Sequence, residues 1–282
     1  MTDTYVTDRR ADQRGTADRR RHPREPFVEF QDLHKAYGPK HVLRGATLKV
    51  YRGEVLVILG GSGTGKSVTL RHMLGLEAPD SGRVIVEEED ITELPEEELY
   101  RVRKKFGMLF QSGALFDSMT VFENVAFPLR EHTEMSEEEI TRAVREKLEL
   151  VNLPNTEHLM PVDLSGGMRK RVGLARSIVL DPKVILYDEP TTGLDPITAQ
   201  TINELIVDLQ AKLSVTSVVV THDIHSAFSV GDRIAFLHQG VFEWVGSMDE
   251  ARDSDHPRLR DFLKASAVVA AQPTKTATRN EG

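Results

Sequence analysis

The chain has 282 residues and a formal net charge of -8, with 39% hydrophobic and 28% charged residues, which is typical of a globular protein with one large domain or two small ones. The acidic balance argues mildly against a nucleic-acid binder, and the lack of cysteine excludes disulfides and thiolate metal sites and fits a reducing compartment. The sequence contains no run of about 18 apolar residues and no secretory leader, so we expect the protein to stay in the cytoplasm.

Both ends of the chain have the composition of tails. We expect residues 1–26, dominated by Arg, Asp, Thr and Pro, to be disordered. Their arginines could contact anionic lipid headgroups, but the interleaved acidic residues favour a solvated tail. Residues 265–282 combine a small apolar patch with a polar end, so we expect a flexible terminus unless a partner holds it.

Between these ends, short apolar runs alternate with helical patterns, which predicts an α/β domain with a mostly parallel sheet. The run VLVIL (55–59) is continuous, as is typical of a strand covered on both faces. A helix is expected at SVTLRHMLGL (67–76). The other strand candidates are FVEFQDL (27–33), HVLRGATLKV (41–50), SGRVIV (81–86), FGMLF (106–110), KVILY (183–187), TSVVV (216–220) and RIAFL (233–237).

Two further helices can be placed more closely. In residues 136–151, Ser136 and Glu139 have the spacing of a capping box, and in residues 195–213 a proline follows the first residue. Each segment has an apolar stripe that we expect to pack in the core. The stripes are Ile140, Val144, Leu148 and Val151 in the first helix, and Ile202, Leu205, Ile206, Leu209 and Leu213 in the second.

The run VLVIL leads into GGSGTGKS (60–67) and then a helix, which matches the G-x-x-x-x-G-K-S pattern in its strand-loop-helix context. Glycines let the backbone wrap around phosphate oxygens, and N–H groups at a helix N-terminus point at the anion. Lys66 would contact the β- and γ-phosphates, and the Ser67 hydroxyl would ligate Mg²⁺. A merely flexible Gly/Ser loop is disfavoured by the eight matched positions. The ATP-binding residues assigned to this loop are Gly60, Gly61, Ser62, Gly63, Thr64, Gly65, Lys66, Ser67 and Val68.

Polar residues follow two of the later strand candidates. Asp188 is suited to hold Mg²⁺, and Glu189 to polarise the water that attacks the γ-phosphate. Alone, this pair would favour an ordinary turn, but beside a phosphate loop a site is favoured. His222 could hydrogen-bond the γ-phosphate as a neutral imidazole and orient the attacking water, although a lone histidine at a strand end is more often structural.

The fragment LSGGM (164–168) opens another helical pattern. Its serine and glycines would present a hydroxyl and N–H donors to an anion. Because the first loop already binds the phosphates of its own nucleotide, a second cradle indicates closure on the nucleotide of another subunit.

Taken in order, KAYG, GGSGTGKS, Gln111, LSGGM, ILYDE, GLDP and His222 resemble the ATP-binding cassette (ABC) ATPases, and the resemblance spans residues 27 to about 264. It implies a P-loop NTPase fold with a RecA-like core, an antiparallel β-subdomain and an α-helical signature subdomain at about residues 112–182. It also implies hydrolysis of ATP to ADP and phosphate with Mg²⁺, in a head-to-tail homodimer that encloses two ATP molecules.

The same resemblance implies further residue roles. Tyr37 would stack on adenine, Gln111 would reach Mg²⁺ and its water, and Asp195 would couple the two sites of the dimer. Contacts to the γ-phosphate across the dimer would come from Ser165, Gly166 and Gly167. Met168 stands where this family usually has glutamine and cannot make the same side-chain hydrogen bonds. We expect activity to survive, because the phosphate-facing donors are unchanged.

The segments 109–139 and 160–178, with QSGALF, NVA, PLREHT and LSGGM, closely resemble the ATPases of the Mla (maintenance of lipid asymmetry) and Mkl group. The resemblance implies a subunit that powers phospholipid or other lipid transport between membranes from the cytoplasmic face of the inner (plasma) membrane. Its partners would be a membrane permease, an MCE-domain lipid-binding protein and, in some systems, a STAS-domain protein. We expect no nucleic-acid partner.

The stretch after Gln111 contains more apolar side chains than a small helical arm obviously needs. We expect most of them to pack inside the arm, and a few, such as Leu115 and Phe116, to line a groove that receives a short permease helix. The full set is Leu115, Phe116, Met119, Val121, Phe122, Val125 and Phe127.

Two alternatives stay open at this point. The motor of another ABC importer or exporter, for amino acids or lipoproteins, would look the same, since only the permease would differ. A soluble ABC protein that regulates or binds nucleic acid is disfavoured by the single cassette, the acidic balance and the lack of a long coiled-coil insertion.

Overall fold

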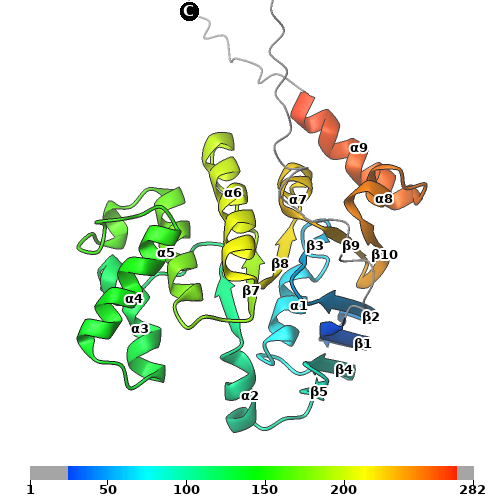
Figure 1. The fold of residues 1–282 in the computed structure, drawn as a ribbon. Coiled ribbons are helices and arrows are strands. Elements are labelled where there is room, and N and C mark those ends of the chain that lie inside the picture. The colour runs from blue at the N-terminus through cyan, green and yellow to red at the C-terminus, as the bar shows by residue number, and fades with distance from the viewer. Residues whose placement is uncertain (1–24, 272–282) are drawn as a thin grey trace, which may run out of the picture.

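Two β-sheets lie at the centre of the computed structural model, which describes residues 25–271 (Figure 1). The larger sheet has the strand order β10-β9-β3-β8-β7-β6. All its neighbouring strands are parallel except β9 and β10, which confirms the predicted, mostly parallel sheet. Its strands are β3 (Val55–Leu59), β6 (Phe106–Leu109), β7 (Val184–Asp188), β8 (Thr216–Thr221), β9 (Arg233–His238) and β10 (Val241–Ser247).

The smaller sheet has the order β2-β1-β4-β5 and is antiparallel throughout, as expected for the β-subdomain. Its strands are β1 (Pro26–Tyr37), β2 (Lys40–Tyr51), β4 (Ser81–Val86) and β5 (Glu89–Asp90). Strand β1 begins one residue before the predicted domain start and continues beyond the seven residues that we assigned to it.

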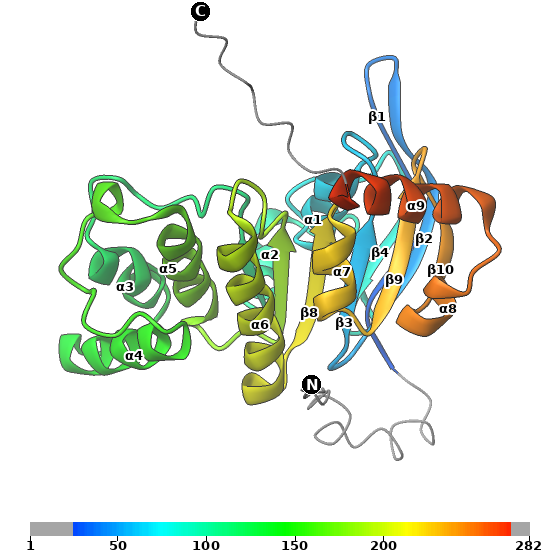
Figure 2. The ribbon, with the colours of Figure 1, turned by 90° about the horizontal axis from the view of Figure 1, so that it is seen from above.

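Three helices, α3, α4 and α5, form an arm on one side of the larger sheet, and the smaller sheet lies on the opposite side (Figures 1 and 2). No helix within residues 25–271 is long and apolar enough to cross a membrane. The helices are α1 (Lys66–Met73), α2 (Glu96–Arg103), α3 (Val121–His132), α4 (Glu137–Leu150), α5 (Gly166–Ile178), α6 (Pro196–Leu213), α7 (Ile224–Val230), α8 (Met248–Arg252) and α9 (Pro257–Ala271), with a 3-10 turn at Pro161–Asp163.

Strand β3 separates two hydrophobic clusters. Its side chains at Val55, Val57 and Leu59 pack in the cluster that includes the arm and helix α6, while Leu56 and Ile58 pack in the cluster that includes α1 and the smaller sheet. Successive residues of a strand point to opposite faces, and both faces of β3 are covered. All five side chains are therefore buried. The prediction that VLVIL is covered on both faces is therefore confirmed.

The two helices with apolar stripes are present where they were expected. Ser136 and Glu139 form the predicted capping box of α4, and Asp195 caps α6, with Pro196 as its first residue. The predicted stripes are buried, except that Leu213, in the last turn of α6, is only partly covered.

The last helix, α9, continues to Ala271, so residues 265–271 are helical rather than part of the flexible tail expected from residue 265. The helix is anchored by Leu259, which is fully buried, and by Phe262, whose ring lies 5.4 Å from that of Phe236 in β9. The remaining parts of both predicted tails, residues 1–24 and 272–282, lie outside the described residues.

The two sheets are joined through the carboxylate of Glu87, in the turn between β4 and β5. Its oxygens lie 3.0 Å from an Arg52 nitrogen, 2.8 Å from Lys105 Nζ and 3.0 Å from Lys183 Nζ. Burial disfavours the charged form, but the hydrogen bonds from Lys105, Lys183 and Arg52 outweigh it and lower the pKa of Glu87 from 4.5 to about 2. The side chain is 16% exposed, so solvent screens these contacts only partly.

We expect Glu87→Gln to lower the free energy of unfolding at pH 7 by about 1–3 kcal/mol, because three cations lose their charged partner. Since the folded pKa is depressed, this stabilisation is fully present above the ordinary pKa of 4.5 and is lost as pH falls toward 2. Urea unfolding followed by circular dichroism at several pH values measures it. The control Asp255→Asn, at a fully exposed carboxylate, should leave stability nearly unchanged. A difference between Glu87→Gln and wild type that is as large at pH 2.5 as at pH 7 would contradict the assignment.

Candidate active site

The carboxyl ends of β3, β7 and β8 lie side by side, because these strands are parallel neighbours. The glycine-rich loop 60–67 follows β3, Asp188 ends β7, and His222 follows β8. Three motifs that are far apart in the sequence therefore meet at one edge of the larger sheet.

The loop after β3 curls back on itself before α1 begins. Gly63 and Gly65 have φ angles of 75° and 107°, which favour glycine, and a Cβ on Gly60 would lie only 2.4 Å from the carbonyl oxygen of Leu237. The buried Lys66 donates from Nζ to the carbonyls of Gly60 and Gly61, both at 2.9 Å. The loop thus forms a glycine-lined cradle at the N-terminus of an eight-residue helix, which suits a phosphate group.

The side chain of Val68 points into the hydrophobic cluster beneath α1. The backbone N–H is therefore the only group of Val68 that is available to a phosphate bound in the cradle.

Ser67 and Asp188 face each other across the cradle, with the hydroxyl donating to a carboxylate oxygen at 2.9 Å. Burial raises the pKa of Asp188, although the hydrogen bond from Ser67 opposes this. Within residues 25–271, no group of three or more His, Cys, Asp or Glu side chains could hold a metal by itself. A hydroxyl and one carboxylate are instead the oxygen donors typical of Mg²⁺ that completes its shell with water and substrate phosphates.

Glu189 lies between the cradle and the end of β8. Its Oε1 is 3.3 Å from Lys66 Nζ, and its Oε2 is 2.9 Å from His222 Nδ1 and 3.2 Å from the Thr192 hydroxyl. The residue is 9% exposed and has a positive φ of 48°, which is uncommon for a side chain of this size and recurs at functional sites. The carboxylate is therefore held in one orientation by groups from two neighbouring loops.

The contact with Glu189 restricts what His222 can do. When Nδ1 carries the ring proton, it donates to the Glu189 carboxylate, which only accepts hydrogen bonds when ionised. A neutral ring then offers Nε2 as an acceptor, which suits a water molecule, whereas donation to a phosphate would require the doubly protonated ring. The contact of His222 with the γ-phosphate stays a prediction, and the side chain, 55% exposed, is accessible to water.

The LSGGM residues lie at the start of α5, against the start of α6. Ser165 caps α5, with its hydroxyl accepting from the N–H of Met168. A Cβ on Gly166 would lie 3.3 Å from Leu194 Cδ2, and one on Gly167 would lie 2.4 Å from Thr198 Cγ2. Asp195 caps α6 through the N–H groups of Ile197 and Thr198. Within one chain, Ser165, Gly166, Gly167 and Asp195 thus form a second group, which contacts itself rather than the cradle.

Gln111 lies two residues beyond the end of β6 and is exposed. The segment that follows it is held by side chains of two helices. Arg176 of α5 donates to the carbonyls of Gly113 and Ala114, at 3.2 and 2.8 Å. The buried amide of Asn124 in α3 accepts from the N–H of Phe116 and donates to the carbonyls of Phe116, Met119 and Thr120. The chain after Gln111 is therefore part of the arm.

The apolar residues of this segment differ in burial, and Leu115, which we expected at a groove, packs against the hydrophobic cluster instead. Val121 and Val125 are fully buried, and Leu115 and Phe122 are partly covered by the same hydrophobic cluster. Phe116 is 43% exposed, with its ring 5.1 Å from that of Phe127.

Tyr37 ends β1 at the tip of the β1–β2 hairpin, with its ring 41% exposed. Its hydroxyl donates to Glu77 Oε2 at 2.6 Å, a contact that the sequence did not indicate.

Sequence reasoning also missed Lys170, which is buried in α5 and donates from Nζ to the carbonyl of Glu189 at 3.3 Å. Burial lowers the pKa of this amine. Residues three and four apart on a helix share a face, so the position of Lys170 between Gly167 and Leu174 could have indicated that its side chain is buried.

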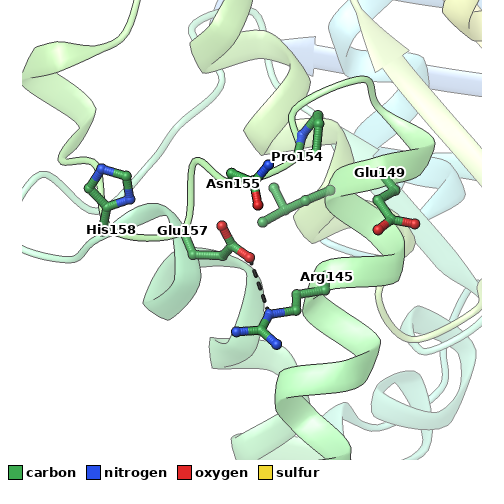
Figure 3. A pocket seen from close by; sticks show the side chains of 7 residues that line it. Arg145, Glu149, Pro154, Asn155, Glu157 and His158 are labelled. Atoms are coloured by element: carbon green, nitrogen blue, oxygen red, sulfur yellow. Dashed lines mark hydrogen bonds and ion pairs between the residues drawn. The ribbon is translucent and has the colours of Figure 1, made fainter.

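The surface of the described part of the chain is hollowed beside the cradle and beside α4. One hollow, of about 390 Å³, lies beside the cradle and is lined by Ser62, Gly63 and Thr64 together with parts of β2 and the β9–β10 turn. The other, of about 580 Å³, lies between α4 and the loop after it, where Arg145 pairs with Glu157 (Figure 3). Its lining contains none of the predicted site residues, and its polar, open walls give it no clear chemistry.

Comparisons with known proteins agree with this geometry. Residues 43–192 match the family described as ABC transporter. The chain is 44% identical over 248 residues to the "Probable ribonucleotide transport ATP-binding protein mkl" of Mycobacterium leprae, covering 88% of this chain and 72% of the relative. It is 42% identical over 241 residues to the "Intermembrane phospholipid transport system ATP-binding protein MlaF" of Escherichia coli K12, covering 86% of this chain and 90% of that one.

Solved structures have the same fold. One is a dimeric ATP-binding cassette in a post-hydrolysis state with ADP and Pi, with a TM-score of 0.72 and 34% identity over 78% of this chain and 98% of that one. Another is cbiO1 from Clostridium perfringens, part of an ABC transporter complex, with a TM-score of 0.76 and 28% identity over 87% and 99%.

The contact between Gly167 and Thr198 can be tested by a double-mutant cycle. We expect Gly167→Ala to lower the free energy of unfolding by about 1–3 kcal/mol, because the new methyl group overlaps Thr198 Cγ2. Thr198→Ser removes that methyl group but keeps the hydroxyl that donates to Asp195, so the double variant should recover most of the loss. Denaturant unfolding of the four proteins measures it. Gly166→Ala, which meets only the mobile end of Leu194, is the milder control, and strictly additive losses would contradict the contact.

Proposed function

This chain belongs to the ABC transporter family, and we propose that it is the ATP-hydrolysing subunit of a system that moves lipids between membranes through a separate permease. The observation that carries hydrolysis is the buried Glu189 carboxylate, in contact with both Lys66 and His222. The cargo is inferred from the relatives and from the resemblance of the segment after Gln111.

The glycine cradle is proposed to bind the β- and γ-phosphates of ATP. The positive φ angles of Gly63 and Gly65 let the loop curl around an anion at the N-terminus of α1. Ser67, Asp188 and Gln111 would hold Mg²⁺, which when bound neutralises charge on the phosphates. Lys66 now binds two loop carbonyls and Glu189, and phosphate oxygens would take over its ammonium group. That exchange frees Glu189 Oε1 to face the attacking water.

Glu189 would then act as the general base. It accepts a proton from the water whose oxygen attacks the γ-phosphorus, and the bond from that phosphorus to the bridging oxygen of ADP breaks. His222 holds the other carboxylate oxygen through Nδ1 and offers Nε2 to the same water. ADP and phosphate are the products, and the proton leaves Glu189 for solvent.

The second group of residues supports a head-to-tail dimer. Ser165, Gly166 and Gly167 lie at a helix N-terminus and contact the start of α6 within their own chain, so their donors are available to the nucleotide of a second copy. Asp195, beside them, would link the two sites. The dimeric relative with bound ADP and Pi supports this arrangement.

Lipid is the cargo that we favour. The relative named for phospholipid transport is matched over 90% of its length. The partners in this proposal are a permease dimer in the inner membrane, an MCE-domain protein and, in some systems, a STAS-domain protein. The chain would be peripheral on the cytoplasmic face. The second candidate cargo is a ribonucleotide, after the name of the Mycobacterium relatives.

Purification from detergent-solubilised membranes tests the cargo. Recovery of a permease and an MCE-domain protein with bound phospholipid supports the proposal, and ATP-dependent movement of labelled phospholipid between vesicles would establish it. A co-purified permease that moves labelled ribonucleotide but not lipid would favour the second candidate. A purely soluble partner would contradict both forms of transport.

We expect Glu189→Gln to keep ATP binding but to slow phosphate release by roughly 10²- to 10⁴-fold, the usual contribution of a positioned base. Phosphate release, equilibrium binding of ATP and light scattering measure these effects. The variant should accumulate as an ATP-bound dimer, whereas Lys66→Ala should weaken nucleotide binding itself. Glu204→Gln, on the exposed surface of α6, is the matched control. Turnover of Glu189→Gln within about 10-fold of wild type would exclude Glu189 as the base.

Phe116 is the residue that we expect to contact the permease, because its ring is exposed on the segment that continues from Gln111. Phe116→Ala should weaken binding to the permease by about 10-fold or more, as is typical of a truncated aromatic anchor, while the isolated subunit binds ATP normally. Assembly in detergent measures the first and nucleotide titration the second. Val245→Ala, at a similarly exposed apolar side chain of β10, should assemble like wild type. Normal assembly of Phe116→Ala would place the interface elsewhere.

A further inference from the structure

The hydroxyl of Tyr37 donates to Glu77 Oε2 at 2.6 Å, across 40 residues of sequence. Tyr37 is at the tip of the β1–β2 hairpin, and Glu77 lies in the segment between α1 and β4. Tyr37 is 41% exposed, so a contact at its hydroxyl restricts the orientation of the ring. A half-exposed aromatic ring without such a contact would sample several orientations.

Glu77 is itself held from several directions. Its carboxylate lies 3.2 Å from Lys35 Nζ and 3.6 Å from Arg71 Nε, and its backbone carbonyl contacts His72 Nδ1 at 2.7 Å. The side chain is mostly covered. Burial disfavours its charge, but the hydrogen bonds from Tyr37 and Lys35 outweigh this and lower the pKa of Glu77. The acceptor that faces Tyr37 is therefore a fixed, charged carboxylate.

The surroundings of the ring restrict it further. Lys35 Nζ lies 5.6 Å from the centroid of the Tyr37 ring, within the range of a cation–π contact. Lys35 also donates to the carbonyl of Ala78 at 2.8 Å, and Asp80 accepts from the backbone N–H of Ala36 at 2.6 Å. One side of the ring is thus occupied by an ammonium group that belongs to the same network.

We propose that Glu77 is a positioning residue for nucleotide binding, which fixes the Tyr37 ring so that its open face stacks on the adenine base. The inference rests on the proposed function and on the stacking of Tyr37 on adenine that the family resemblance implies. Glu77 does not touch the nucleotide and acts only through the tyrosine hydroxyl.

Helix α1 gives this role a structural reason. It begins with Lys66 and Ser67 at the phosphate cradle, and the ring of His72, in its last turn, binds the carbonyl of Glu77. Eight helical residues span about 12 Å. One end of this short helix therefore carries the groups for the triphosphate. The other end contacts Glu77, which holds the tyrosine for the base, so the helix sets the spacing between the two. This arrangement selects for a ligand that has both a base and a triphosphate at that spacing.

The test separates binding of the base from binding of the phosphates. ATP and inorganic tripolyphosphate, each with Mg²⁺, are titrated calorimetrically against the full chain and its variants. Tyr37→Phe keeps the ring but removes the hydroxyl, and Glu77→Ala removes the acceptor. Each should weaken ATP binding by roughly 2- to 10-fold, as for the loss of one hydrogen bond, and leave tripolyphosphate binding unchanged. The double variant should bind ATP no more weakly than the single variants.

The matched control is Tyr100→Phe, because Tyr100 is 43% exposed and its hydroxyl is likewise hydrogen-bonded, to His132 at 2.6 Å. This variant should bind both ligands like wild type. Tyr37→Phe is the decisive variant if Glu77→Ala folds poorly, since it leaves the carboxylate network intact.

Three results would overturn the proposal. The first is unchanged ATP binding in Tyr37→Phe, and the second is an equal loss of affinity for ATP and tripolyphosphate in Glu77→Ala. The third is a loss of ATP affinity in the double variant that equals the sum of the two single losses. Failure of the proposed function looks different. Unchanged ATP binding in Tyr37→Ala would remove the base site, and unchanged tripolyphosphate binding in Lys66→Ala would remove the phosphate cradle.

Discussion

The carboxylate of Glu189 connects the loops that follow neighbouring strands, and the arrangement of the site depends on it. One oxygen faces Lys66 after β3, the other faces His222 after β8, and its backbone carbonyl accepts from Lys170 of α5. A buried carboxylate is stable only while its partners remain, and the positive φ of this residue adds strain that the same contacts hold in place. A ligand that draws the Lys66 ammonium group away therefore removes one of the charged partners that hold the Glu189 carboxylate in place.

The segment after Gln111 joins the arm to the end of strand β6. Arg176 and Asn124 hold the backbone after Gln111 to α5 and α3, so only residues 110–112 lie between strand β6 and the first of these contacts, at Gly113. Gly113 and Gly173 approach so closely that a Cβ on Gly173 would lie 2.8 Å from the Gly113 carbonyl oxygen. The segment after Gln111 therefore moves together with α3 and α5, because packed groups shift together.

The sequence allowed the sheet, the cradle and the strand-end residues to be predicted, because each follows from local periodicity or from a motif with its own chemistry. VLVIL and the stripe of α4 were identified for that reason. The pairing of Tyr37 with Glu77, the three cations around Glu87 and the buried Asn124 could not be predicted, since each joins segments that only the fold brings together. The extent of α9 depends likewise on its packing against β9, which no local pattern indicates.

The position of β3 also constrains how the protein is made. The strand ends at residue 59, but both of its neighbours in the sheet, β8 and β9, begin only at residues 216 and 233. Pairings this distant in sequence form late, and a chain leaving the ribosome from its N-terminus has neither neighbour while the cradle residues are already outside. The sheet edge that carries the cradle is therefore completed only after nearly the whole domain has been translated.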